Sequence, residues 1–177
     1  ALDRLVQEGR HAFLRQFPHV ASADGGKLLA VPADPGTFAA CKLDHGERER
    51  GAHAQVLLLH RELLRLRRDD AVFAAQDRER MHGAVLGPEA FLLRFFGTDG
   101  DDRLLLVNLG TTLPLVPMAE PLLAPPAGCR WALRWHSEDP RYGGNGMAEP
   151  DGEHSWRLPG HALAVLAPAP IQEDIDG

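Results

Sequence analysis

The sequence is poor in the residues that mark redox, membrane or nucleic-acid proteins. Its 177 residues include two cysteines, Cys41 and Cys129, in segments of different character. A reduced, cytoplasmic protein is therefore a simpler interpretation than a disulfide-bonded one. No apolar run approaches the roughly 20 residues that span a bilayer. Because the net charge is -6, nucleic-acid phosphates would repel the chain, and we expect neither a nucleic-acid nor a membrane partner.

Motifs for metal or cofactor binding are also missing. The nine histidines are scattered: His53 and His60 are seven residues apart, while His136 and His154 lie on separate segments. The sequence has no H-E-x-x-H pair and no Cys/His cluster, and nothing in it resembles a nucleophile elbow or a phosphate loop. We therefore expect no metal and no cofactor.

The spacing of apolar residues changes at Glu89. Before this residue apolar side chains recur at helical spacing, and after it they alternate as in strands. With 44% hydrophobic residues, the chain has enough apolar side chains to bury a core. The change predicts an α + β chain in four parts: a helical segment at 1–70, a connector at 71–88, an all-β antiparallel domain at 89–168 and a flexible tail at 169–177.

Two amphipathic helices are predicted in the helical segment. Residues 1–17 place apolar side chains near one face, and Pro18 ends this helix because it lacks a backbone donor. Residues 47–68 form the more regular helix, and Asp44 with Glu47 has the form of a capping box at its start. Its apolar stripe consists of Ala52, Val56, Leu59, Leu63 and Leu66. The connection at 18–46 carries apolar pieces, so we expect it to be packed.

Short strands separated by turns are predicted in the rest of the chain. The strand at 129–135 alternates cleanly, and its inward side chains are Cys129, Trp131, Leu133 and Trp135. The other predicted strands are 91–96, 103–109, 113–116, 154–158 and 162–166. Such a series is typical of an antiparallel sandwich or barrel.

Three segments together resemble one enzyme family. The first combines Lys-Leu-Asp at 42–44, Glu-Arg-Glu-Arg at 47–50 and His-Arg-Glu-Leu-Leu-Arg-Leu-Arg-Arg at 60–68. The second is Leu-Leu-Leu-Val-Asn-Leu-Gly at 104–110. The third is Ser-Glu-Asp-Pro-Arg-Tyr-Gly-Gly at 137–144, closed by Trp-Arg-Leu-Pro-Gly at 156–160. From about Leu2 to Pro168, the chain resembles the C-terminal part of the malto-oligosyltrehalose trehalohydrolases of the α-amylase superfamily.

The resemblance implies the terminal helices of a (β/α)₈ barrel followed by a C-terminal β-sandwich. It also implies a retaining glycosidase that hydrolyses the α-1,4 bond next to the trehalose end of maltooligosyl trehalose, using two carboxyl groups. Ala1 aligns beyond the last barrel strand, so no catalytic residue is carried over and the chain alone is expected to be inactive. The implied partners are the N-terminal catalytic barrel of the same protein and the maltooligosyl trehalose substrate.

Two sets of residues are candidates for contact with sugar. In a barrel, the loop before the helix at 47–68 would border the catalytic face, which makes Asp34, Lys42, Asp44 and His45 candidate substrate-binding residues. Alternatively, Asp44 caps the helix and Lys42 pairs locally. In the β domain, Trp135 and Tyr142 are possible sugar contacts, with Glu138, Asp139 and Arg141 beside them. In the competing interpretation, Trp135 belongs to the core and Asp139 starts a turn.

Two functional interpretations remain open at this point. In the first, the chain is the C-terminal portion of a trehalose-producing glycosidase. In the second, it is a carbohydrate-binding or protein-interaction module without catalysis, built on the β-sandwich. They differ over the stripe containing Leu59, Leu63 and Leu66, which a barrel fragment would leave open and an evolved module would cover. Glu62 has arginines nearby at helical spacing, so we interpret it as part of a solvated face.

Overall fold

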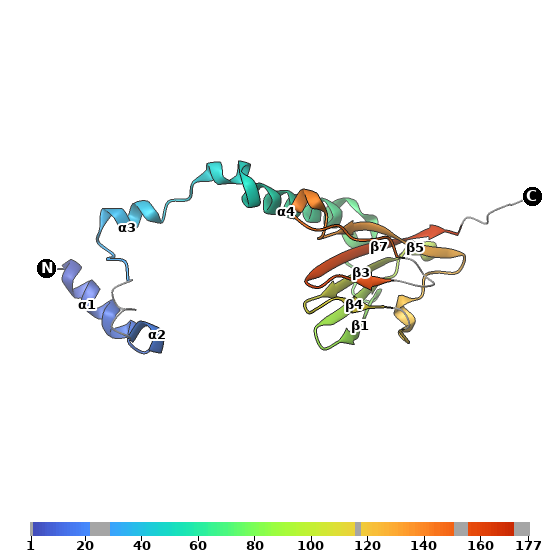
Figure 1. Cartoon of the computed structure of the whole chain (residues 1–177), viewed down its shortest axis with the longest axis horizontal. Coiled ribbons are helices and arrows are strands. Elements are labelled where there is room, and N and C mark those ends of the chain that lie inside the picture. The colour runs from blue at the N-terminus through green and yellow to red at the C-terminus, as the bar shows by residue number, and fades with distance from the viewer. Residues whose placement is uncertain (1, 22–28, 116–117, 151–155, 172–177) are drawn as a thin grey trace, which may run out of the picture. The chain divides into compact units, whose positions relative to one another are not determined.

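The structure is a computed structural model that describes residues 2–21, 29–115, 118–150 and 156–171. The chain divides into two compact units, Ala1–Gly46 and Glu47–Gly177. Figure 1 shows their elements, and each unit is described by itself.

The described residues of the first unit form three α-helices, and none of these residues is buried. The helices are α1 (Leu2–Leu14), α2 (Pro18–Ala21) and α3 (Pro35–Ala40). Helix α1 confirms the predicted amphipathic helix, but its apolar side chains stay open, with Phe13 64% exposed. The predicted packing of the connection at 18–46 is not seen in its described residues, where Phe38 is 67% exposed.

The boundary between the units falls within the 3-10 turn η2 (His45–Glu49), and the second unit continues with α4 (Gly51–Asp69) and α5 (Ala71–Ala74). The predicted capping box is wrong, because α4 begins at Gly51, whose φ of +48° lies in the left-handed region. Asp44 instead accepts a hydrogen bond from the N–H of Gly46 at 2.9 Å.

The strands of the described residues form one five-stranded antiparallel sheet and a two-stranded ribbon (Figure 1). The sheet has the order β1-β2-β3-β7-β5, and the ribbon pairs β4 with β6. The bounds are β1 Met81–Gly87, β2 Ala90–Phe95, β3 Arg103–Asn108, β4 Leu113–Pro114, β5 Cys129–His136, β6 Arg157–Leu158 and β7 Ala162–Pro170. The short 3-10 turns are η3 Thr98–Gly100, η4 Pro121–Leu123 and η5 Pro140–Tyr142.

The predicted division of the chain needs two corrections. The sheet begins at Met81, inside the predicted connector at 71–88, because β1 pairs with β2 along its length. Strand β7 continues to Pro170, inside the predicted tail at 169–177. Its Pro168 lies beyond Leu166, where the pairing with β3 ends, so this proline interrupts no ladder on that side. The predicted sandwich is confirmed as an antiparallel β domain, although its second layer, among the residues that the structure describes, is only the ribbon.

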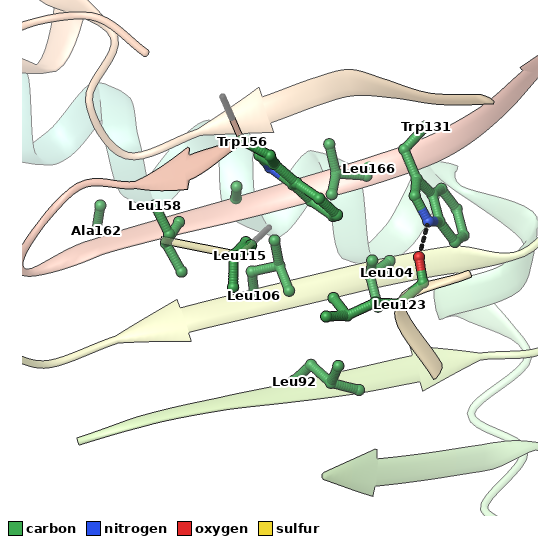
Figure 2. Packing of buried hydrophobic residues seen from close by; sticks show 11 residues of the cluster. Leu92, Leu104, Leu106, Leu115, Leu123, Trp131, Trp156, Leu158, Ala162 and Leu166 are labelled. Carbon is green, nitrogen blue, oxygen red and sulfur yellow. Dashed lines mark hydrogen bonds between the residues drawn. The ribbon is translucent and has the colours of Figure 1, made fainter. Parts of the chain in front are cut away.

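The hydrophobic core lies between one face of the sheet and the ribbon side of the domain. Figure 2 shows the cluster, which includes Leu92, Leu104 and Leu166 of the sheet and Leu115, Trp156 and Leu158. Trp131 extends this core, and its Nε1–H donates to the Leu123 carbonyl at 2.8 Å. Because a buried indole N–H needs an acceptor, this bond fixes η4 over the sheet.

Two polar side chains of the core face hold loops in place. Arg94 is 7% exposed; it binds Asp102 at 2.7 Å and donates to the Ala124 carbonyl. The amide of Asn108 donates to the carbonyls of Thr111 and Pro159 at 2.7 and 2.8 Å. Buried polar groups are stable only when bonded in this way, so these contacts determine where the loops cross the core.

Candidate functional site

The four predicted substrate-binding residues lie at exposed positions at the end of the first unit. Asp34 caps α3, with its Oδ1 accepting from the N–H of Gly36 at 2.7 Å. The Nζ of Lys42 lies 4.8 Å from the centre of the Phe38 ring. Asp44 bonds its own turn, and His45 is the first residue of η2. These contacts are local, and the binding of sugar by Asp34, Lys42, Asp44 and His45 stays a prediction.

Trp135, the first predicted sugar contact of the β domain, is turned away from the core by a β-bulge. The register of β5 on β7 runs from Leu133 opposite Leu166 to Trp135 opposite Val165, so Arg134 is the extra residue. The predicted alternation is therefore correct for Trp131 and Leu133 but wrong for Trp135. Trp135 shares the helix-facing side of the sheet with Val165 and is 9% exposed.

Tyr142 joins Trp135 to helix α4. The Nε1–H of Trp135 donates to the Tyr142 hydroxyl at 3.1 Å, and the hydroxyl donates to Oε2 of Glu62 at 2.5 Å. Burial, followed by the bond to Glu62, raises the pKa of Tyr142 above its usual value. The hydroxyl therefore stays protonated and remains a donor to the carboxylate.

Arg141 adds a charged contact at the same place. Its Nη1 lies 3.1 Å from Oε1 of Glu62, and its Nη2 lies 2.8 Å from Oδ2 of Asp139. Asp139 also caps η5 through the N–H of Arg141, and the hydrogen bond from the Arg141 side chain lowers the pKa of this carboxyl. The candidate sugar patch is thus a junction that binds η5 to α4 through Glu62, and we call it the Glu62 junction.

A second junction lies at the end of α4, around Asp70. This side chain is fully buried and accepts from Nε of Arg103 at 2.8 Å, while Nε of Arg134 lies 3.1 Å away. Asp70 also caps α5 by accepting from the N–H groups of Val72 and Phe73. Burial would lower the pKa of Arg103, but bonds to Asp101 and Asp70 raise it. The extra residue of the β5 bulge therefore helps to bind the helical segment to the sheet.

Between the two junctions, the apolar stripe of α4 faces the sheet. Leu63 and Leu66 line a hollow of about 420 Å³ together with three side chains of the sheet, Phe95, Leu105 and Val165. Both leucines are half-buried, whereas Val56, nearer the start of the helix, is 50% exposed. The sheet therefore covers the C-terminal part of the stripe and leaves its N-terminal part open.

The ion pairs of these two junctions hold the helical elements to the β domain. The carboxylates of Glu62, Asp70 and Asp139 each have an arginine partner within 3.1 Å, so all three are engaged in ion pairs within the domain. In the part of the chain that the structure describes, no group of three or more His, Cys, Asp or Glu residues could hold a metal ion. The described helices also include none that is long and apolar enough to cross a membrane.

Glu62 and Asp70 are the site residues that sequence reasoning missed. Glu62 pairs with Arg141, 79 residues away in the sequence, so its helical neighbours gave no indication of this contact. Asp70 did carry a signal, because an aspartate directly before Ala71, Val72 and Phe73 is a helix N-cap pattern.

The three segments of the predicted family resemblance meet in the second unit. Glu62 of the first segment contacts Arg141 and Tyr142 of the third. Asn108 of the second contacts the carbonyls of Leu158 and Pro159, which close the third. Their order in the sequence therefore corresponds to a set of direct contacts.

Comparison with known proteins agrees with this arrangement. Residues 78–165 match the family described as "Domain of unknown function (DUF3459)". The chain is also 37% identical over 109 residues to the malto-oligosyltrehalose trehalohydrolase of Deinococcus radiodurans. The matched part is 62% of this chain and 17% of that relative's length. No solved structure matches the chain significantly.

The family match begins at residue 78, just before β1, and ends at residue 165 within β7. It thus covers the ribbon and the sheet up to the first part of β7, and its start agrees with the observed start of the sheet better than with the predicted one at Glu89. The predicted resemblance to the C-terminal part of malto-oligosyltrehalose trehalohydrolases is confirmed, and residues 78–165 match DUF3459, the C-terminal domain of α-amylase-family enzymes.

Proposed function

We propose that this chain is the C-terminal portion of a retaining α-glycosidase that releases trehalose from maltooligosyl trehalose. The enzyme hydrolyses the α-1,4 bond next to the trehalose end, and its two catalytic carboxyl groups belong to an N-terminal barrel. The identity of 37% to a trehalohydrolase supports this activity. The engagement of Glu62, Asp70 and Asp139 with arginines supports placing the catalytic acids elsewhere.

In this proposal the β domain holds the end of the barrel in place. The observation that carries this role is the bonding of Glu62, in the middle of α4, to Arg141 and Tyr142 of the β domain. Helix α4 is also apolar away from the sheet, since Leu64 is 64% exposed. A helix with apolar residues on more than one side is typically buried between two layers. The barrel would pack on the side of Leu64 and on the open N-terminal part of the stripe at Val56, and the sheet covers Leu63 and Leu66.

This arrangement revises the predicted role of the apolar stripe. Leu59, Leu63 and Leu66 were expected to contact barrel strands, but Leu63 and Leu66 line the hollow against the sheet. This partial coverage is what the alternative, a carbohydrate-binding or protein-interaction module, predicted, whereas a barrel fragment was expected to leave the stripe open. Of that alternative, carbohydrate binding has less support because the two aromatic rings proposed to stack on sugars are engaged. Trp135 is 9% exposed, and the hydroxyl of Tyr142 is bonded on both sides.

A chimaera tests the proposed activity. The chain would replace the corresponding C-terminal part of the Deinococcus radiodurans trehalohydrolase, and trehalose release from maltooligosyl trehalose would be measured. The matched control is the same relative truncated at the point where the two sequences would be joined. We expect the chimaera to release trehalose and the isolated 177-residue chain to release none. A folded chimaera without activity would contradict the assignment to this enzyme class, as would trehalose release by the isolated chain.

A further inference from the structure

The two edges of the five-stranded sheet differ in how well they are protected from pairing with a strand of another chain. On the outer edge of β5, Arg130 and Arg134 are exposed, and the bulge at Arg134 interrupts the regular ladder. The N–H of Leu133 is already bonded to a carboxylate oxygen of Glu149 at 3.0 Å. Charges, bulges and capped N–H groups are the means by which proteins prevent a sheet edge from pairing with another chain.

The other edge, β1, has no comparable protection along most of its length. Met81–Gly87 contains no Lys, Arg, Asp, Glu or Pro, and its bulge lies at the end, between Val85 and Gly87. The side chains of Met81 and Val85 are 39% and 80% exposed. An uncharged, exposed and regular edge strand is able to accept another strand.

The register of β1 on β2 shows which backbone groups face outward. The N–H of Phe96 donates to the carbonyl of Arg80 at 2.8 Å, so these two residues form a hydrogen-bonded pair. Because such pairs alternate in an antiparallel ladder, His82 and Ala84 bond to β2, and Gly83 and Val85 point their N–H and C=O groups away from it. Neither outward N–H has a hydrogen-bond partner among the described residues.

We propose that β1 pairs with β1 of a second copy of this chain, antiparallel and about a two-fold axis at Gly83. The two Gly83 residues then exchange N–H to carbonyl bonds. The N–H of Val85 donates to the carbonyl of Met81 in the second copy, and the reverse bond forms by symmetry. This pairing is isologous, so one sheet continues into the other through a closed dimer interface.

The composition of β1 favours a second copy over an unrelated strand. In a self-pair, each side chain meets residues of the same segment, and β1 contains no Lys, Arg, Asp or Glu whose burial in the interface would cost free energy. Met81 and Val85 lie on the same face and come opposite each other in this register, forming an apolar cross-strand pair on each side of Gly83. Phe91 of β2 pairs with Val85 of β1 and is 36% exposed, and it continues this apolar face.

The oligomeric state of the 177-residue chain tests this proposal. Sedimentation equilibrium should find a reversible dimer, and amide exchange at Gly83 and Val85 should slow as the dimer fraction rises. Val85→Pro removes one outward N–H without touching the bonds to β2 and should make the chain monomeric. Val85→Thr keeps both that N–H and the side-chain shape and should retain the dimer. Circular dichroism would confirm that both variants keep their sheet.

Three results would overturn the proposal. A chain that stays monomeric at every concentration would show that no second copy pairs with β1, even if another partner does. A dimer that persists in folded Val85→Pro would place the interface elsewhere. Loss of the dimer in Val85→Thr as well as in Val85→Pro would show that the backbone bonds are not what holds it.

Discussion

At the scale of single residues, Tyr142 is bonded on both sides, to Trp135 of β5 and to Glu62 of α4. Tyr142→Phe keeps the ring and removes both bonds. Because a net hydrogen bond contributes about 1 kcal/mol, we expect urea unfolding to show a loss of roughly 1–3 kcal/mol. Combining this change with Glu62→Gln should cost less than the sum of the two single changes, since both act on one contact. Strict additivity, or no loss in Tyr142→Phe, would contradict the Glu62 junction.

Asp70 contributes more than Tyr142 to the free energy of unfolding, because its carboxylate is fully buried between Arg103 and Arg134. Asp70→Asn removes the buried carboxylate that Arg103 and Arg134 share, while Arg103 keeps its pair with Asp101. Because a hydrogen bond to a charged group contributes about 1.5–3 kcal/mol, we expect a loss of at least that size. The neighbouring Asp69 provides a matched control, since its pair with Arg68 is exposed. We expect Asp69→Asn to change the free energy of unfolding much less than Asp70→Asn does. Equal effects of the two changes, measured by urea unfolding, would show that the Asp70 junction does not hold the helical segment.

The acidic groups paired with arginine also give the domain a pH dependence. Hydrogen bonds from Arg141 and Arg103 lower the pKa values of Asp139 and Asp101, respectively. A folded-state pKa below the unfolded one stabilises the fold above the unfolded value, about pH 4, and this contribution is lost as the pH falls through the folded value. The thermal midpoint should therefore drop on acidification below about pH 4. Asp139→Asn should make that drop shallower; an unchanged profile would rule out a contribution from Asp139.

At the scale of elements, the two sides of α4 should respond differently to the same substitution. Leu63 lines the hollow against Phe95 and Leu105, so Leu63→Asp places a charge at a half-buried apolar contact. We expect a loss of about 1.5–3 kcal/mol or more in the isolated chain. Leu64→Asp, on a side chain that is 64% exposed, is the matched control and should change little there. In the chimaera, both substitutions should reduce the yield of folded enzyme, because the barrel is proposed to cover Leu64.

Sequence patterns predicted the elements whose apolar spacing is regular and missed those defined by partners. Helix α4 and strands β2, β3 and β5 were identified within a few residues because one spacing holds along each of them. Strand β1 was missed because two of its seven residues are glycines and its outer positions are open. The bulge at Arg134 moved Trp135 to the other face, and one extra residue of this kind leaves no mark in an alternating pattern.

The residues of the candidate site were predicted, but their contacts with α4 were not, and sugar binding by Trp135 and Tyr142 stays a prediction. Trp135, Asp139, Arg141 and Tyr142 do come together, as expected for a patch. Their common partner is Glu62, which lies 79 residues before Arg141, and contacts at such separation are fixed by topology rather than by local sequence. Only pairs three or four residues apart can be predicted directly from helical spacing.

At the scale of the whole molecule, the two units differ in what they bury. The second unit has a core between its sheet and ribbon, whereas the described residues of the first unit include none that is buried. Several large apolar side chains of the first unit are mostly exposed, including Leu2, Leu5 and Phe13. Several large apolar side chains exposed on one small unit usually mark a surface that another part of a protein covers. In the proposed enzyme, this part is the barrel.

The central claim is that this chain supports the catalytic part of a trehalose-releasing enzyme without supplying its acids. The most direct test is kcat per folded molecule of the chimaera carrying Asp34→Asn and Asp44→Asn, with maltooligosyl trehalose as substrate. These carboxylates are candidate substrate contacts in the first unit, so a rise in KM with kcat nearly unchanged is the predicted result. Loss of a general acid or base typically lowers kcat by 10²- to 10⁴-fold. A fall of about that size in folded enzyme would place catalytic chemistry in this chain and contradict the account.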